Sequence, residues 1–388
     1  MSSSQDTAAN NPIATAPDSA ADEWVISDQV VQLRQWGTSL VFPLPEPPIT
    51  TCVIGSTDTC SLQLVDPSGL LSRQHARLVR RAAMLPSCLD VMPELHRDKW
   101  IAHDLSKNGL RLDGARRAEF ELDPGIELGV GDITLIAESA KLIALRGFLA
   151  RLLGWASDRT AVVDHALRTV RMAATNRATL VLCGAGDLVP VARSLHRHTL
   201  GPDRPFVTCD PRRRRSKGNV RSAPNFKEGL AALQAASGGS LGLLAWRPPA
   251  DISEVLAALR DPRTRVQLIV CTQERRDSER YLAVPITVPA LPDRASELDR
   301  IIFEYAQEAI AELGGCRPPG FTSDDHAWVR NCSSQTLPEI EKGTRRLVAL
   351  RQCRNISQAA SRLGMAPVSL SRWLDRRPHH PSSREASR

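Results

Sequence analysis

A glycine-rich turn in the middle of the chain has the spacing of a site for phosphate chemistry. Residues 179–183 are apolar or β-branched, Gly184 and Gly186 lie in the turn, and residues 191–196 have a helical pattern. A strand, a glycine loop and a helix in this order cradle phosphate with backbone N–H groups, and a Lys followed by Ser or Thr completes a nucleotide site. No such pair follows these glycines. We therefore expect a structural turn that keeps the shape of the loop and lacks its reactive groups.

Hydroxyl, amide and basic side chains form a second candidate set nearer the N-terminus. Ser72-Arg73 and Ser106-Lys107-Asn108 stand in turn-rich sequence between short β-prone runs. A phosphothreonine carries close to two negative charges, and its recognition needs hydroxyl donors, an arginine and an amide that holds the peptide backbone. Short strands with regular turn signals over residues 24–138 predict an all-β sandwich that would position these loops.

The order and spacing of these motifs resemble the forkhead-associated (FHA) domain. Ser-x-x-His begins at Ser72, Ser-x-Asn-Gly begins at Ser106, and Gly55 precedes both. The resemblance implies that the sandwich binds a phosphothreonine peptide. The candidate phosphopeptide-binding residues are Arg73, Ser72, Asn108, Ser106, Lys107 and Ser56.

The same resemblance implies a role for each of these residues. Ser72 and Arg73 would contact the phosphate, Asn108 would hold the peptide backbone, and Ser106 and Lys107 would lie nearby. His75 would shape the loops, as would the glycines. The family usually has an arginine directly after its first glycine, where this chain has Ser56, and this difference removes one cation from the phosphate site.

From residue 177 to residue 345, short apolar strands alternate with helical runs, which predicts a parallel α/β sheet. The order of the pieces resembles the AAA+ domain of sigma-54-type bacterial enhancer-binding activators. The matching stretches are residues 191–196, 204–207, 238–241, 266–272 and 285–294. The resemblance implies an α/β body over residues 177–290 and the remnant of a helical lid over residues 291–345.

In the register of that family, each catalytic element is replaced. Leu188 and Val189 stand where a Lys and a hydroxyl would meet phosphate and Mg²⁺, and Pro338 stands where an arginine would sense nucleotide. The acidic pair of the Walker B strand is absent, and residues 210–218 replace the remodelling loop. The four arginines at 212–215 would contact nucleic acid, RNA polymerase or an acidic protein, or form a solvated loop. We expect no enzyme activity, no cofactor and no metal site.

A third candidate set lies near the C-terminal end of the sequence. Ser357 can cap a first short helix, Gly364 supplies a tight turn, and Pro367 suits the start of a second helix. The pattern strongly resembles the Fis-type helix-turn-helix of the same activators, over residues 346–377, which implies that the second helix enters the major groove of DNA. The candidate DNA-binding residues are Arg372, Ser369, Val368, Trp373, Arg376 and Arg377. For Trp373, packing against the preceding helix is an equal alternative.

Positive charge is concentrated in the same segment. The chain has a net charge of +7, yet residues 343–388 contain ten Arg against only Asp375 and Glu385. The rest of the chain is therefore near neutral. A basic segment on a near-neutral body favours a polyanionic partner such as double-stranded DNA.

Composition limits the remaining possibilities. Nine cysteines show no Cys-x-x-Cys or zinc-finger spacing, which favours reduced thiols over a metal site. The best apolar run, residues 142–155, is interrupted by two arginines and predicts an amphipathic helix, so no membrane partner is expected. Residues 1–23 have no apolar signal core and predict a disordered tail of a cytoplasmic protein. Residues 139–176 predict a helical connector, and residues 378–388 a basic tail.

The sequence thus predicts a multidomain protein with an all-β FHA sandwich, an α/β AAA+-like domain with a helical lid, and an all-α helix-turn-helix. The favoured function is a DNA-binding transcriptional regulator that couples phosphothreonine recognition to sequence-specific DNA binding without ATP hydrolysis. Two alternatives stay open: a sigma-54-dependent activator with ATPase activity, and a phosphopeptide adaptor in Ser/Thr kinase signalling that does not bind DNA. Expected partners are a phosphothreonine-containing protein, double-stranded DNA, RNA polymerase or a sigma factor, and further copies of the chain in a homodimer or higher oligomer.

Overall fold

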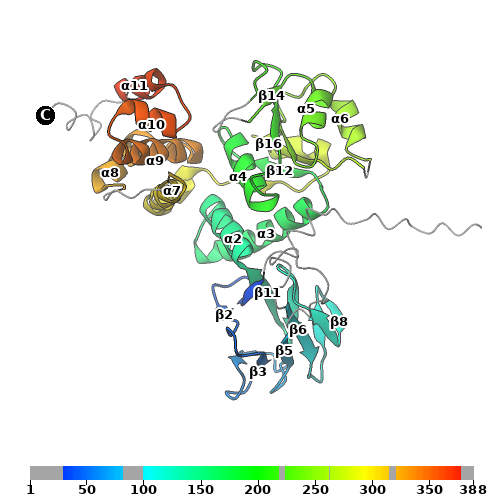
Figure 1. The fold of residues 1–388 in the computed structure, drawn as a ribbon. Coiled ribbons are helices and arrows are strands. Elements are labelled where there is room, and N and C mark those ends of the chain that lie inside the picture. The colour runs from blue at the N-terminus through cyan, green and yellow to red at the C-terminus, as the bar shows by residue number, and fades with distance from the viewer. Residues whose placement is uncertain (1–28, 82–98, 218–222, 262, 314–319, 377–388) are drawn as a thin grey trace, which may run out of the picture.

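The computed structural model describes residues 29–81, 99–217, 223–261, 263–313 and 320–376. A β-sandwich is followed by two connecting helices, a parallel sheet with helices, and a group of C-terminal helices (Figure 1). In this view the sandwich lies below the connecting helices, whereas the parallel sheet and the C-terminal helices lie above them. The two predicted tails lie outside the described residues.

Two sheets form the sandwich, as predicted. One has the order β2 (Val41–Pro43), β1 (Val30–Gln35), β11 (Ile133–Ser139), β10 (Glu127–Val130), β7 (Leu110–Leu112) and β8 (Ala115–Arg117). The other has the order β4 (Leu62–Gln63), β3 (Thr51–Gly55), β5 (Ala76–Arg81), β6 (Lys99–Asp104) and β9 (Glu119–Glu121). Alternate residues of both sheets share one core, which includes Leu33, Ile54, Leu78 and Leu128.

The last strand of the sandwich runs directly into the connector. Ser139 ends β11 and caps α2 (Ala140–Leu153), because its hydroxyl accepts a hydrogen bond from the backbone N–H of Leu142 at 3.2 Å. A short 3-10 turn, η2 (Ser157–Arg159), then leads to α3 (Thr160–Thr175). The connector and the β10–β11 turn therefore lie at opposite ends of β11, about 20 Å apart for a seven-residue strand.

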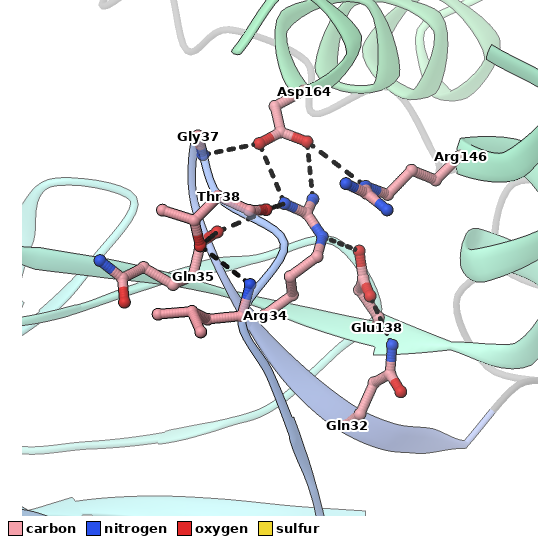
Figure 2. A network of polar contacts seen from close by, with 9 residues as sticks. Gln32, Arg34, Gln35, Gly37, Thr38, Glu138, Arg146 and Asp164 are labelled. Atoms are coloured by element: carbon pink, nitrogen blue, oxygen red, sulfur yellow. Dashed lines mark hydrogen bonds and ion pairs between the residues drawn. The ribbon is translucent and has the colours of Figure 1, made fainter. Parts of the chain in front are cut away.

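A buried ionic network fixes the sandwich to the connector (Figure 2). Arg34 of β1 donates to Glu138 of β11 at 2.7 Å and to the two carboxylate oxygens of Asp164 on α3 at 2.7 and 3.0 Å. The backbone N–H of Gly37 donates to the same carboxylate at 2.8 Å. All three charged side chains are at most 1% exposed. Removing one partner of such a buried set typically costs about 3–5 kcal/mol, because the remaining charge is left buried without its partner.

The parallel sheet confirms the predicted α/β region. Its strands are all parallel, in the order β14 (Asn225–Phe226), β13 (Phe206–Cys209), β15 (Ser240–Leu244), β16 (Gln267–Thr272), β12 (Leu180–Cys183) and β17 (Ile286–Thr287). On β12, Leu180 and Leu182 face the core shared with the connector, whereas Val181 faces a separate core. The sheet is therefore buried on both faces, as parallel sheets require. The surrounding helices are α4 (Val189–Thr199), α5 (Gly229–Ala235), α6 (Ile252–Ala258) and η3 (Arg275–Tyr281).

The C-terminal helices form one connected group. They are η4 (Leu291–Glu297), α7 (Leu298–Leu313), α8 (Ser323–Cys332), α9 (Leu337–Gln352), α10 (Ile356–Arg362) and α11 (Pro367–Asp375). The predicted boundary between residues 345 and 346 falls inside α9, so the expected lid remnant and helix-turn-helix share a helix. An ion pair between Arg351 and Asp325, at 3.1 Å, ties α9 to α8. Arg351 and Asp325 lie on opposite sides of the predicted domain boundary and are 26 residues apart, so local sequence patterns did not reveal this contact.

Candidate functional site

Three loops meet beside the β10–β11 turn, at the end of the sandwich away from the connector. Gly131, in the β10–β11 turn, lies against the backbone of Leu71 in the loop before β5. The backbone N–H of Ser56, just after β3, donates to the carbonyl of Ser72 at 3.2 Å. The backbone N–H of Lys107, between β6 and β7, donates to the Ser72 hydroxyl at 3.3 Å. The structure thus brings the predicted loops together around Ser72.

The buried side chain of His75 positions the Ser72 loop. The ring is fully buried, and its Nδ1 accepts a hydrogen bond from the backbone N–H of Ser72 at 3.1 Å. Burial lowers the pKa of His75, which keeps the ring neutral and its Nδ1 able to accept. The loop-shaping role predicted for this residue agrees with these contacts.

The Arg73 backbone is held while its side chain faces solvent. Its carbonyl accepts hydrogen bonds from the Thr57 hydroxyl and the Cys60 thiol, both at 3.1 Å. A Cβ on Gly55 would collide with the same carbonyl, so only glycine fits at this point. The Arg73 and Lys107 side chains are both exposed. Two cations are therefore available beside the Ser72 hydroxyl.

Ser106 and Asn108 have different contacts within the third loop. The Ser106 hydroxyl donates to Asp104 at 2.7 Å and accepts from the backbone N–H of Gly109 at 2.7 Å. Partial burial opposes ionisation of Asp104, but the hydrogen bonds from Ser106 outweigh it and hold the pKa of this carboxyl below its usual value. Asn108 is exposed, and its amide donates to the Leu70 carbonyl at 2.8 Å. Ser106 thus shapes the loop, whereas Asn108 links it to its neighbour at the surface.

Arg116 is a further basic residue at this site, and the sequence motifs do not include it. It lies on β8, opposite Arg111 of β7, and its guanidinium occupies the space beside Gly109. It also donates to the carbonyl of Lys107 at 3.5 Å. The sequence signal for it is the Asp113-Gly114 turn, which folds β8 back along β7. Arg116 thus adds a cation beside the β6–β7 loop, next to Gly109 and Lys107.

A comparison with protein families matches residues 52–134 to the model of the FHA domain. This part of the chain is an FHA domain. The match spans most of the sandwich, from β3 to the start of β11, and includes all the loops described above. A search of curated proteins finds none that is similar to this chain.

Several solved structures match part of this chain. One is the FHA domain of the CT664 protein from Chlamydia trachomatis, at 20% identity over 27% of this chain and 92% of that chain, with a TM-score of 0.20. Another is the Slr1951 protein from Synechocystis sp., at 21% identity over 28% of this chain and 95% of that chain, with a TM-score of 0.22. A third is the yeast Dun1 FHA domain in complex with a doubly phosphorylated peptide, at 17% identity over 35% of this chain and 85% of that chain, with a TM-score of 0.24.

The glycine loop of the parallel sheet has a different environment. It follows β12 at the carboxyl edge of the sheet, where Leu188 is only 3% exposed. A Cβ on Gly184 would lie 3.0 Å from both the Cβ and the carbonyl of Val288, and one on Gly186 would lie 3.2 Å from the side chain of Thr336. Side chains from β17 onward and from the cap of α9 therefore occupy the space beside this loop.

The C-terminal helices place the candidate DNA-binding residues on two sides of α11. Val368, Ser369, Arg372 and Arg376 are exposed. Trp373 is 8% exposed, and its ring packs edge-on against Trp328 of α8 at 5.3 Å between centroids. Trp373 therefore follows the packing alternative that the sequence left open, with Trp328 of α8 as its partner in the core. Arg377 lies outside the described residues.

The turn between the two short helices agrees with its predicted role, but the cap does not. Gly364 has a φ of 62°, as a tight turn requires. The cap of α10 is Asn355, whose side chain accepts a hydrogen bond from the backbone N–H of Gln358 at 2.9 Å. Ser357 lies within the first turn of the helix. Both residues suit a cap, and the helix begins two residues earlier than the hydroxyl pattern indicated.

The described part of the chain lacks two further kinds of site. No group of three or more His, Cys, Asp or Glu side chains there could hold a metal ion. None of the helices described there combines the length and the apolar character needed to cross a bilayer.

Proposed function

We propose that the FHA domain of this chain binds a phosphothreonine peptide at the Ser72 loop. One observation carries the proposal: the Ser72 hydroxyl and the Lys107 backbone N–H lie 3.3 Å apart, with the exposed Arg73 beside them. A hydroxyl, a backbone amide and cations fixed at one surface are the groups that bind a phosphate ester. The match to the FHA family model supports the same class of ligand.

Fluorescence anisotropy with the full-length chain tests this proposal. A labelled phosphothreonine peptide library is compared with its unphosphorylated counterpart, and Arg73→Ala is compared with wild type. Loss of one charged hydrogen-bond donor should weaken binding about 10- to 100-fold. Arg77→Ala is the matched control, because Arg77 is an exposed arginine of β5 outside the loops. Equal binding of phosphorylated and unphosphorylated peptides would refute the proposal.

The exposed face of α11 supports a second function, recognition of double-stranded DNA. Leu370 and Trp373 anchor the helix in the core, and Val368, Ser369 and Arg372 point outward. Outward polar and basic side chains on the second helix of such a pair are suited to base edges and phosphates in the major groove. The chain would then be a transcriptional regulator that couples phosphothreonine recognition to sequence-specific DNA binding.

Selection of preferred sequences from a random duplex library by the full-length chain tests this second function. Arg372→Ala should lose sequence preference and about 1–3 kcal/mol of discrimination. Arg260→Ala serves as the control, because Arg260 is exposed in the α/β body away from α11. An unselective or absent interaction with duplex at low salt would favour the phosphopeptide adaptor that does not bind DNA.

The α/β body fits a non-catalytic scaffold derived from an AAA+-like ATPase. Its glycine loop follows an inner strand at the carboxyl edge of a parallel sheet, the usual place for a phosphate. The buried Leu188 and the contacts of Val288 and Thr336 oppose nucleotide binding there. Neither ATP hydrolysis nor a shift of the melting temperature with Mg-ATP is expected. Measured hydrolysis would favour the alternative of a sigma-54-dependent activator.

A further inference from the structure

A basic loop follows β13 at the carboxyl edge of the parallel sheet. Residues 212–215 are four consecutive arginines, and Lys217 follows them; all five side chains are exposed. Because β12, β13, β15 and β16 are parallel, this loop lies on the same edge of the sheet as the glycine loop after β12. It is the edge at which ligands of parallel sheets bind.

The backbone of the basic loop is fixed by buried polar groups. Asn225 is 4% exposed, and its amide donates to the carbonyls of Asp210, Arg213 and Arg214 at 3.2, 3.5 and 3.4 Å. Ser216 forms a two-way backbone bridge with Asn225, at 3.0 Å in each direction. A buried amide that donates to three carbonyls of the loop preorganises residues 210–214, so a ligand need not order them on binding.

The acidic residue of this loop does not neutralise its surface. Asp210 is 4% exposed, and its carboxylate accepts from the backbone N–H of Arg212 at 3.0 Å and pairs with Arg247 at 3.4 Å. Its charge is thus directed inward and balanced by a residue from another strand end. At the other end of the loop, the Arg215 guanidinium lies 5.1 Å from the centre of the Phe226 ring.

We propose that this loop, residues 212–217, binds the phosphate backbone of duplex DNA and adds a sequence-independent contact to that of α11. The inference rests on DNA as the ligand of the proposed function. DNA presents a negative charge about every 1.7 Å along its axis, which suits a run of cations better than any single anion does. The loop offers no large apolar side chain, whereas a protein partner would need an apolar centre to its interface. Both α11 and β14 lie at the end of the molecule away from the sandwich (Figure 1).

The test uses the full-length chain and a labelled random-sequence duplex of about 30 base pairs, titrated at several salt concentrations between about 50 and about 200 mM. The variant is Arg212→Gln/Arg213→Gln. The matched control is Arg260→Gln/Arg263→Gln, because these two arginines are exposed at the opposite, amino edge of the same sheet, before β16. Loss of two phosphate contacts should reduce the slope of log K against log salt by about 2, whatever the sequence of the duplex, and the control should keep the wild-type slope.

A slope for Arg212→Gln/Arg213→Gln equal to that of wild type overturns the inference and leaves recognition by α11 intact. Arg372→Ala separates the two contacts, because it should remove sequence preference and keep the slope difference between the loop variant and its control. Binding of polyglutamate that the loop variant loses, with its DNA slope unchanged, would overturn the inference in favour of an acidic protein. If wild type binds no duplex at low salt, the inference and the DNA-binding function fail together, while the phosphopeptide function stands.

Discussion

Two loops of this chain have the glycine scaffold of a phosphate site, and their surroundings differ. In the FHA domain, Gly55 makes room for a backbone carbonyl, and the cations Arg73 and Lys107 stay at the surface. In the α/β body, Val288 and Thr336 fill the space beside the glycines. Glycines thus preserve the path of a backbone, whereas binding depends on which side chains reach the space they leave. The side chains that lie beside a glycine loop are therefore a better guide to phosphate binding than the glycines themselves.

Restoring the missing lysine in the α/β loop should have the largest effect. Leu188 is part of the core shared with the connector, so Leu188→Lys buries a charge without a partner. We expect a loss of roughly 3 kcal/mol in the free energy of unfolding, measured by urea denaturation, and no affinity for ATP. Leu188→Met, which keeps the volume, should cost less than about 1.5 kcal/mol. If Mg-ATP stabilises Leu188→Lys against urea, the missing lysine alone accounts for the lack of nucleotide binding in the α/β loop.

The glycine of the FHA loop should be nearly as intolerant. Gly55→Ala forces a methyl group into the Arg73 carbonyl, which cannot move without losing its contacts to Thr57 and Cys60. We expect a loss of about 2 kcal/mol in unfolding free energy together with loss of phosphopeptide binding. Gly147→Ala is the control, because no atom lies within 4 Å of the added methyl group and the position is helical. Unchanged phosphopeptide affinity in Gly55→Ala would show that binding does not depend on the position of the Arg73 backbone.

Local patterns predicted the two loops but not the contacts that hold the domains together. Each FHA motif spans only about four residues, and the structure brings the loops that carry these motifs together around Ser72. Arg34 was not predictable as a core residue, since its partner Asp164 lies 130 positions away and a lone arginine suggests an exposed side chain. Trp373 was ambiguous for the same reason, because Trp328 decides its environment. The sequence patterns did not reveal which distant residues the buried polar and aromatic side chains contact.

Acid should destabilise the chain through buried histidines in both regions. Burial lowers the pKa of His75 in the FHA domain, and burial lowers that of His196 in the α/β body to about 4. The His196 ring contacts the Ser240 hydroxyl at 2.8 Å through Nδ1 and the Arg204 carbonyl at 2.9 Å through Nε2. The carbonyl raises the pKa of the ring, but burial outweighs it. In the unfolded chain these histidines have a pKa near 6.5, so below that pH they bind protons that they do not bind in the folded chain. Stability is therefore complete above about pH 6.5 and falls as the pH drops towards 4.

For His196 alone the loss should be about 2 kcal/mol at a pH of about 5, measured as the difference in urea unfolding free energy from that near pH 7.5. His196→Gln should lower stability near neutral pH and flatten this pH dependence. His165→Gln is the control, because His165 is exposed on α3. Equal pH dependence in wild type and His196→Gln would place the acid sensitivity at the other histidines whose pKa burial lowers, His75 and His198.

The smallest effects should come from two substitutions in the β6–β7 loop, one at a residue that shapes the loop and one at a residue that contacts the ligand. The Ser106 hydroxyl is used twice inside the loop, so Ser106→Ala should cost about 1 kcal/mol in unfolding free energy and change phosphopeptide affinity little. Asn108 is exposed, and Asn108→Ala should do the reverse, with a loss of affinity of about 5- to 10-fold and little loss of stability. If Ser106→Ala weakens the phosphopeptide more than Asn108→Ala does, the hydroxyl must turn to the ligand. The α/β loop has no hydroxyl in the place of its missing Lys-Ser pair that could turn in this way.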